Sequence, residues 1–223
     1  MKGHNVWYSD RKVVRFRGRD QYVRSRRVVV INSGYRNRFH NGMSIYYLPP
    51  AGAAIVASAY VISAALAQPS AIYDALYAPP VVHVNRRYTI DQVVEDPQVR
   101  QMVRSVDMDI NFASGSSDIP DGELRDVNAV AHAMKRVLKQ HPHATFLVEG
   151  HTDATGDPED NLLLSEDRAA AVVAVLEGEY GIPRDNLEAV GYGEQYLKED
   201  TKGPSAANRR VVVRNVSGLL TAN

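Results

Sequence analysis

The sequence predicts an α/β (α+β) fold, a two-layer sandwich in which strands alternate with helices before a final pair of strands. The evidence lies in residues 104–218. Apolar and polar residues alternate from Val106 to Phe112, as expected for a half-buried strand. Two later stretches keep the three-and-four spacing of helices with one buried stripe. Strands that alternate with helices in this way favour a sheet covered by helices.

In chain order, we expect a strand at Val106–Phe112, a turn at Ala113–Asp121, a helix at Glu123–Gln140, a strand at Thr145–Val148, a helix from Asn161, and strands at Leu187–Tyr192 and Arg209–Val216. The turn is rich in Gly, Ser, Asp and Pro, which interrupt regular structure. Pro142 ends the first helix, and Gly181 with Pro183 ends the second.

The stretch from Val148 to Ala169 carries the most functional information. A short apolar strand leads into a polar turn that holds Asp153 between two glycines, and a helix that carries Arg168 follows. The acid can hold an ammonium group, and an arginine can hold a carboxylate through two parallel hydrogen bonds. The pattern therefore predicts a pocket for a ligand with both groups, such as an amino-acid head group.

The expected helix supports this pocket. Asn161 is a favourable N-cap, because its side-chain oxygen can accept a hydrogen bond from a free backbone N–H. Asn161, Ser165 and Arg168 then follow at i, i+4 and i+7, so we expect them to share one polar flank. The N-terminus of the helix also carries a partial positive charge that favours a carboxylate.

Five motifs resemble, in order and spacing, the OmpA-like peptidoglycan-binding domain. They are Gly150-His151-Thr152-Asp153, Asn161 with Leu164-Ser165, Arg168-Ala169, Gly191-Tyr192-Gly193-Glu194 and Asn208-Arg209-Arg210-Val211. The resemblance covers about half the chain, Asp107 to Val216, and implies a βαβαββ arrangement. It also implies a domain without catalytic activity, in which Asp153 and Arg168 hold diaminopimelic acid of the peptidoglycan stem peptide.

The candidate ligand-binding residues are therefore Thr152, Asp153, Asn161, Arg168, Asn208 and Arg209. The resemblance implies a chain that anchors the outer membrane or an envelope complex to the wall, in the periplasm or outer membrane of a Gram-negative-type cell. One departure concerns the loop Gln195–Ala207, because Pro204 and Ser205 stand where the family usually carries Gly-Arg. Asn208 and Arg209 either support the pocket or contact the ligand, or Arg209 and Arg210 simply alternate along an edge strand.

Other interpretations stay open. Asp153 and Arg168 could form a structural ion pair on a solvated face. A metal-assisted cell-wall hydrolase would use His151, Asp153 and Asp157, although these are few ligands for a metal site. Ser165 lies in a helix without the Gly-x-Ser-x-Gly turn of hydrolases, so we predict no catalytic residue, no metal and no cofactor. A motor stator-type subunit would need an N-terminal transmembrane helix with an ionisable residue, which the sequence does not indicate.

The formal net charge of zero hides a division of charge along the chain. Residues 1–50 contain eleven Lys or Arg against two Asp, a net charge of +9, and the remainder carries −9. Short alternating stretches in this basic part predict β-strands, with turns at Gly18-Arg19-Asp20 and Asn32-Ser33-Gly34. The surface is either simply solvated or suited to anionic lipid or lipopolysaccharide. Nucleic acid is not expected, because no nucleic-acid motif accompanies the charge.

We divide the chain into a basic β-rich segment (1–50), a connecting segment with short helices (51–103) and the OmpA-like domain (104–218). Ala51 to Ala67 is uncharged, but eight of its seventeen residues are alanine, so we expect buried strand and helix pieces in place of a bilayer span. A short helix is expected at Ser70–Tyr77. No signal peptide is indicated at Met1, cysteine is absent, and a homodimer stays open.

Overall fold

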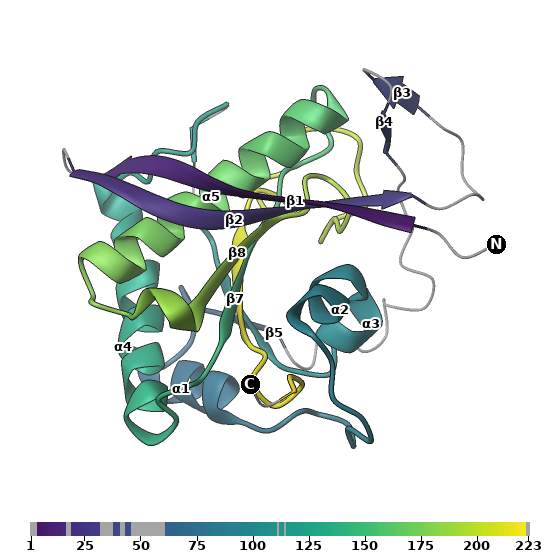
Figure 1. Cartoon of the computed structure of the whole chain (residues 1–223). Helices are drawn as coiled ribbons and strands as arrows, with labels where there is room; N and C mark the ends of the chain where they lie inside the picture. Colours follow the sequence, from purple (N-terminus) through teal and green to yellow (C-terminus); the bar gives the residue numbers. More distant parts are fainter. Residues whose placement is uncertain are drawn as a thin grey trace.

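The computed structural model describes residues 4–16, 19–31, 38–40, 43–45, 61–110, 112–113 and 115–221. Its main feature is one seven-stranded sheet with the strand order β1-β2-β8-β7-β9-β6-β5 (Figure 1). Its strands are β1 (His4–Phe16), β2 (Arg19–Ile31), β5 (Val61–Ser63), β6 (Ser105–Met108), β7 (Phe146–Gly150), β8 (Leu187–Gly191) and β9 (Val211–Asn215). A separate ribbon pairs β3 (Arg38–His40) with β4 (Met43–Ile45).

The expected βαβαββ arrangement is confirmed. Along the chain follow β6, the helix α4 (Leu124–Gln140), β7, the helix α5 (Pro158–Gly178), β8 and β9. β7 pairs with β8 in parallel, and β9 lies antiparallel between β7 and β6. The carboxyl ends of β6, β7 and β8 therefore lie at the same edge of the sheet as the start of β9.

Helices cover one face of the sheet, and a continuous apolar core lies between them and the strands. Val148, Ala189 and Val213, which point to this face from β7, β8 and β9, pack together with apolar residues of α4 and α5. The helix α1 (Pro69–Tyr77) adds Ile72 and Leu76, both fully buried, to the same core. The helix predicted at Ser70–Tyr77 is therefore present, and it contributes to the core of the domain.

Two short helices cover the opposite face. They are α2 (Ile90–Glu95) and α3 (Pro97–Arg100). Val93 and Val94 of α2 pack against Leu147 and Val190, which alternate with the residues of the first core along β7 and β8. The two-layer core of the domain thus carries a third, thinner layer from the connecting segment. The segment boundaries themselves stay predictions.

The helix α5 begins earlier than the sequence indicated. Asp157 is its N-cap, because the side-chain Oδ1 accepts a hydrogen bond from Glu159 N at 2.8 Å. Pro158 suits the first helical position, where its missing N–H costs no hydrogen bond. Asn161 lies inside the first turn, so its predicted role as N-cap is wrong.

The predicted stop of α5 is confirmed: Gly181 has a φ of +66°, and its N–H donates to Glu177 O. The short 3₁₀ turns Asp121–Glu123 and Arg184–Asn186 precede α4 and β8, respectively.

Two strands of the domain, β6 and β9, are shorter than expected. β6 ends at Met108 and β9 begins at Val211. Ile110 and Phe112 nevertheless stay buried beyond the end of β6. The chain after β6 still packs on the core, and for this reason the apolar alternation in the sequence extends beyond the end of the strand.

The basic segment forms one long hairpin in place of the predicted short strands. β1 and β2 each span 13 residues and pair along their full length. Arg19 and Asp20, which we expected in a turn, already belong to β2. The turn predicted at 32–34 lies outside the described residues. Ser25–Arg27 pairs in parallel with Ala189–Gly191, so that the hairpin extends the sheet beyond β8 (Figure 1).

The expectation for the apolar stretch 51–67 is tested only in part, because residues 51–60 lie outside the described residues. Its end forms β5, which pairs in parallel with β6. Across the ranges that the structure describes, no helix combines the length and the apolar character that a bilayer span requires.

Candidate ligand-binding site

The loops that follow β7 and β8 and the segment that precedes β9 meet at one edge of the sheet. Gly150, at the end of β7, is the register partner of both Gly191 and Val211. Just beyond, Thr152 N donates a hydrogen bond to Gly193 O at 3.0 Å. This edge brings together the motif residues around positions 152, 193 and 209.

Two glycines allow α5 to approach this edge closely. A Cβ atom added at Gly150 would lie 1.9 Å from Ser165 O, and one at Gly191 would lie 2.5 Å from Glu166 N. Both contacts are with helix backbone, which cannot move aside as a flexible side chain can. Glycine at these two positions therefore fixes the distance between the sheet edge and the helix that carries Arg168.

Asp153 is buried at this edge, and its carboxylate is hydrogen-bonded on both oxygens. Oδ1 accepts from the backbone N of Thr155 at 3.2 Å and from the hydroxyl of the same residue. Oδ2 accepts from Ser205 N at 3.3 Å and from Arg209 Nη1 at 2.8 Å. Burial opposes ionisation, but these hydrogen bonds outweigh it and hold the pKa of Asp153 below its ordinary value. The side chain is therefore an anion at neutral pH.

Arg168 is 1% exposed and is held by the loop that follows β6. Its Nε donates to Ser116 O at 3.1 Å and its Nη2 to Ala113 O at 3.3 Å, while the Phe112 ring lies 4.8 Å from the guanidinium carbon. The remaining nitrogen, Nη1, is buried without a hydrogen-bond partner. A buried donor in this state is costly and favours a ligand that brings an acceptor.

The two predicted charges share one corner, but each has a different protein partner. The ion pair of Asp153 is with Arg209. Burial and then the charge of Arg209 lower the pKa of Arg168 to about 10, whereas the charge of Asp153 raises it. Arg168 thus stays a cation at neutral pH. A surface ion pair between Asp153 and Arg168 is excluded, because both side chains are buried and Asp153 pairs elsewhere.

The expected flank of Asn161, Ser165 and Arg168 exists, but it is buried and not solvated. The Nδ2 group of Asn161 donates to Thr155 O at 3.0 Å and to Glu194 Oε2 at 2.7 Å. Asn161 therefore ties the Asp153 loop to the loop after β8 and acts by positioning it.

Thr152 lies next to this loop, and the residue is 2% exposed. Its hydroxyl is buried and has no hydrogen-bond partner. Like Nη1 of Arg168, it is a polar group that a bound molecule could satisfy.

Asn208 is fully buried and organises the neighbouring loop. Its Oδ1 accepts from Lys198 N at 2.7 Å and from Glu199 N at 2.9 Å, and its Nδ2 donates to Glu199 O at 2.9 Å. These bonds hold the loop whose Ser205 N reaches Asp153. Arg209 precedes β9, so it does not alternate along an edge strand, and it contacts Asp153 directly.

Sequence reasoning missed several groups of this site. Thr155 and Ser205 bind the carboxylate of Asp153, and the carbonyls of Ala113 and Ser116 hold Arg168. All four residues make these contacts through a backbone group, which almost any residue provides, so their side chains gave no direct sequence signal. For Thr155, its place two residues after an aspartate was the available signal, because aspartate often bonds the backbone two residues on.

A buried charge network lies behind the site on β7. Glu149 is 2% exposed and pairs with Arg214 at 2.9 Å and with Arg100 at 3.8 Å. The guanidinium of Arg100 also lies over Tyr192 and Tyr196, with its carbon 4.3 and 4.8 Å from the ring centres. This network attaches α3 of the connecting segment to the domain.

The residues of the catalytic alternatives have other roles. His151 is 3% exposed, and burial lowers its pKa to about 4, so the ring is neutral at pH 7. Asp157 caps α5. The hydroxyl of Ser165 donates to Leu162 O at 2.7 Å and accepts from Gly193 N at 2.8 Å. Among the residues that the structure describes, no three His, Cys, Asp or Glu side chains are grouped so as to hold a metal ion.

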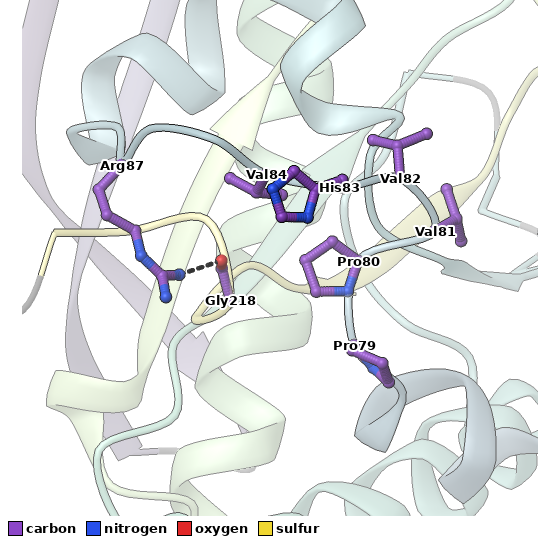
Figure 2. A pocket seen from close by; sticks show the side chains of 8 residues that line it. All are labelled: Pro79, Pro80, Val81, Val82, His83, Val84, Arg87 and Gly218. Atoms are coloured by element: carbon purple, nitrogen blue, oxygen red, sulfur yellow. Dashed lines mark hydrogen bonds between the residues drawn. The ribbon is translucent and has the colours of Figure 1, made fainter.

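A shallow cavity of about 440 Å³ lies away from this edge (Figure 2). It is lined by residues 79–84, Arg87 and Gly218, and the guanidinium of Arg87 donates to the carbonyl of Gly218 across it. It shares no residue with the corner around Asp153 and Arg168. The chemistry of the side chains, and not the volume of a cavity, therefore identifies the candidate site.

The comparisons with known proteins concern the same part of the chain. Residues 111–210 match the model of the OmpA family. This part of the chain is an OmpA-family domain. Over 117 residues, it is 40% identical to Outer membrane porin F of Pseudomonas aeruginosa, which covers 52% of this chain and 32% of the porin. It is 35% identical over 102 residues to a peptidoglycan-associated lipoprotein of Legionella pneumophila, covering 45% of this chain and 55% of the lipoprotein.

A solved structure is also similar to the OmpA-family domain. The peptidoglycan-associated lipoprotein from Burkholderia pseudomallei aligns with 54% of this chain and 97% of its own length, at 28% identity and a TM-score of 0.40. The chain spans 32% of the length of the first porin and 37% of that of Outer membrane protein Omp38 of Acinetobacter baumannii. These outer membrane proteins and lipoproteins confirm the predicted place of the chain, the periplasm or outer membrane of a Gram-negative-type envelope.

Proposed function

We propose that the OmpA-family domain binds peptidoglycan without cleaving it and anchors its carrier to the cell wall. One observation carries the proposal: a buried anion, Asp153, and a buried cation, Arg168, lie at one sheet edge, and the cation has a nitrogen without a partner. The similarity to peptidoglycan-associated lipoproteins supports it.

The bound group is the diaminopimelate of the stem peptide. Its free end carries an ammonium and a carboxylate on one carbon, so it matches one anion and one cation in the same corner. The carboxylate binds Nη1 of Arg168, and the ammonium binds Asp153. The buried hydroxyl of Thr152 supplies a further polar partner, while Asn161 and Asn208 position the two loops. No bond in the ligand is broken in this scheme, so the domain is not an enzyme.

We expect purified sacculi that contain diaminopimelate to co-sediment with the protein, and free diaminopimelate to release it. Sacculi with lysine at the same stem position lack the second carboxylate, so their binding should be about tenfold weaker or more, the loss expected for one hydrogen-bonded charge. Release of soluble wall fragments is the control for cleavage. Equal binding to both kinds of sacculi would contradict recognition of the carboxylate by Arg168.

A second candidate function concerns the basic hairpin, which we propose binds anionic lipid or lipopolysaccharide. The register of β1 and β2 places Arg11 directly opposite Arg24. Like charges at opposed positions destabilise a hairpin, and a bound anion relieves that cost. The net charge of +9 in residues 1–50 supports the same partner.

We expect the full chain to bind vesicles containing phosphatidylglycerol at low salt and to lose this binding as salt rises, because charges are screened within about 8 Å at physiological ionic strength. Replacing Arg11 and Arg24 by Ser should weaken vesicle binding in flotation assays and leave sacculus binding intact. The matched control replaces Lys135 and Lys139, two exposed residues of α4. A control with the same loss of vesicle binding would show that net charge alone is responsible.

A further inference from the structure

We infer that Arg209 occupies, in the ligand-free domain, the position of the ligand's ammonium group and is displaced from Asp153 when the ligand binds. The inference rests on the proposed function. Its starting point is the contact of 2.8 Å between Arg209 Nη1 and Asp153 Oδ2. At that position the guanidinium donates a hydrogen bond to the carboxylate of Asp153, as the ligand's ammonium would.

The acceptor capacity of Asp153 is already used. A carboxylate offers about four lone-pair positions on its two oxygens. Oδ1 receives the N–H and the hydroxyl of Thr155, and Oδ2 receives Ser205 N and Arg209 Nη1. An ammonium brings donors only, so it can reach the carboxylate only if one of these donors leaves.

Two of the four donors are backbone groups held by their surroundings. Thr155 N lies in the same tight turn as Asp153. Ser205 N belongs to a loop that is fixed at both ends, because the Ser205 hydroxyl donates to Glu199 Oε2 at 2.7 Å and Asn208 N donates back to Ser205 Oγ at 3.3 Å. Moving either group requires moving a segment of main chain.

Of the two side-chain donors, Arg209 is the one whose departure conserves charge. If the neutral hydroxyl of Thr155 left, the ammonium would become a third cation beside Arg168 and Arg209. These two cations already repel each other, since Arg209 lowers the pKa of Arg168. When Arg209 leaves instead, one cation replaces another. The side chain of Arg209 is 27% exposed, so it has a path into solvent.

This exchange makes Arg209 a determinant of specificity. It competes with any ligand that brings an ammonium to Asp153, but not with a ligand that only brings a carboxylate to Arg168. Removing the guanidinium should therefore raise the affinity for a ligand that brings an ammonium, and leave unchanged or lower the affinity for a ligand that brings only a carboxylate. A residue that merely supports the fold would change both in the same direction.

The test compares Arg209→Met with the wild type against two probes of equal chain length, diaminopimelate and pimelate, which lacks both ammonium groups. Each probe is measured as a competitor of sacculus binding. We expect diaminopimelate to bind about two- to fivefold more tightly to the variant, the range that corresponds to loss of a partly exposed ion pair. Pimelate should bind equally or more weakly, because a nearby cation is gone. Arg209→Lys keeps a cation but loses the guanidinium, so its affinity for diaminopimelate should lie between those of the wild type and Arg209→Met.

Weaker binding of diaminopimelate by Arg209→Met than by the wild type, with melting temperatures equal, would overturn the inference and make Arg209 a ligand-holding residue. Unchanged affinity for both probes would overturn it as well. If Arg209→Met fails to fold, Arg209→Lys decides, because weaker diaminopimelate binding by that variant also contradicts displacement. A wild-type protein that binds neither sacculi nor diaminopimelate refutes the proposed function itself, and the inference fails with it.

Discussion

Arg168→Ala should lower the affinity for diaminopimelate-containing sacculi about tenfold or more. Hydrogen bonds to charged groups contribute roughly 1.5–3 kcal/mol, and 1.4 kcal/mol corresponds to a factor of ten. Arg168→Lys should also lower this affinity substantially, because an ammonium cannot bind two loop carbonyls and a ligand carboxylate in one plane. Sacculus co-sedimentation over a concentration series measures both changes.

Asp153→Ala should cause a loss of similar size by removing the partner of the ammonium. If Asp153 and Arg168 hold the same ligand, the double variant should lose less than the sum of the single losses, since neighbouring sites are not additive. Full additivity would instead indicate two independent contributions and would contradict a shared ligand.

Arg168 is buried, so its replacement also affects folding. It bridges α5 to the loop after β6, and a lower melting temperature of Arg168→Ala is expected. A residue on a flank in contact with solvent would show no such change. Val137→Ala is a suitable control, because Val137 is fully buried in α4 and is not one of the residues of the site. If both variants lose the same small amount of wall binding, the assignment of Arg168 to the site is wrong.

The regular elements of the domain could be predicted because each buries one face. α4 carries a buried stripe from Val127 to Val137, and β7 and β8 alternate between two cores, so periodicity reports their structure directly. Boundaries were less predictable. Asp157-Pro158 and Asn161 are both good helix starts, and local sequence does not decide between two caps one turn apart.

The hairpin shows a second limit of the sequence pattern. The polar run Ser9–Lys12 interrupts the alternation of β1, so the sequence indicated several short strands. In the structure this run nevertheless pairs residue by residue with Val23–Arg26, so the ladder continues without a break. Such long-range pairing is invisible to a window of neighbouring residues.

The same limit applies to the candidate site. Asp153 and Arg168 were identified because they lie on one strand–loop–helix unit. The pairing of Asp153 with Arg209 was not, because these residues are 56 positions apart and meet only since β9 lies next to β7. The sheet order thus decides which of several arginines neutralises the acid, and the local pattern around each residue does not report that order.

Glu149→Ala should have the largest effect on stability. The substitution leaves Arg214 and Arg100 next to each other in the interior without their common anion. Removing one member of a buried charge pair costs about 3–5 kcal/mol, which denaturant unfolding can measure. Glu177→Ala is the matched control: this side chain is 37% exposed and lies 4.0 Å from Arg184, so its loss should cost about 1 kcal/mol or less. Equal losses in the two variants would contradict a role for the buried network.

The same carboxylate predicts how stability depends on pH. Burial alone would raise the pKa of Glu149, but the charges of Arg214 and Arg100 and its contact with His151 lower it from 4.5 to about 2. A group with a lowered pKa in the folded state stabilises it above the unfolded value, and this contribution, about 3 kcal/mol, is lost as the pH falls from 4.5 to 2. Burial of neutral His151, whose pKa falls from 6.5 to about 4, adds a loss that begins at higher pH. Glu149→Gln should therefore remove most of the decline below pH 4.5 that the wild type shows in urea unfolding. An equally steep decline in the variant would mean that other carboxylates are responsible for acid unfolding, since Gln has no proton to gain there.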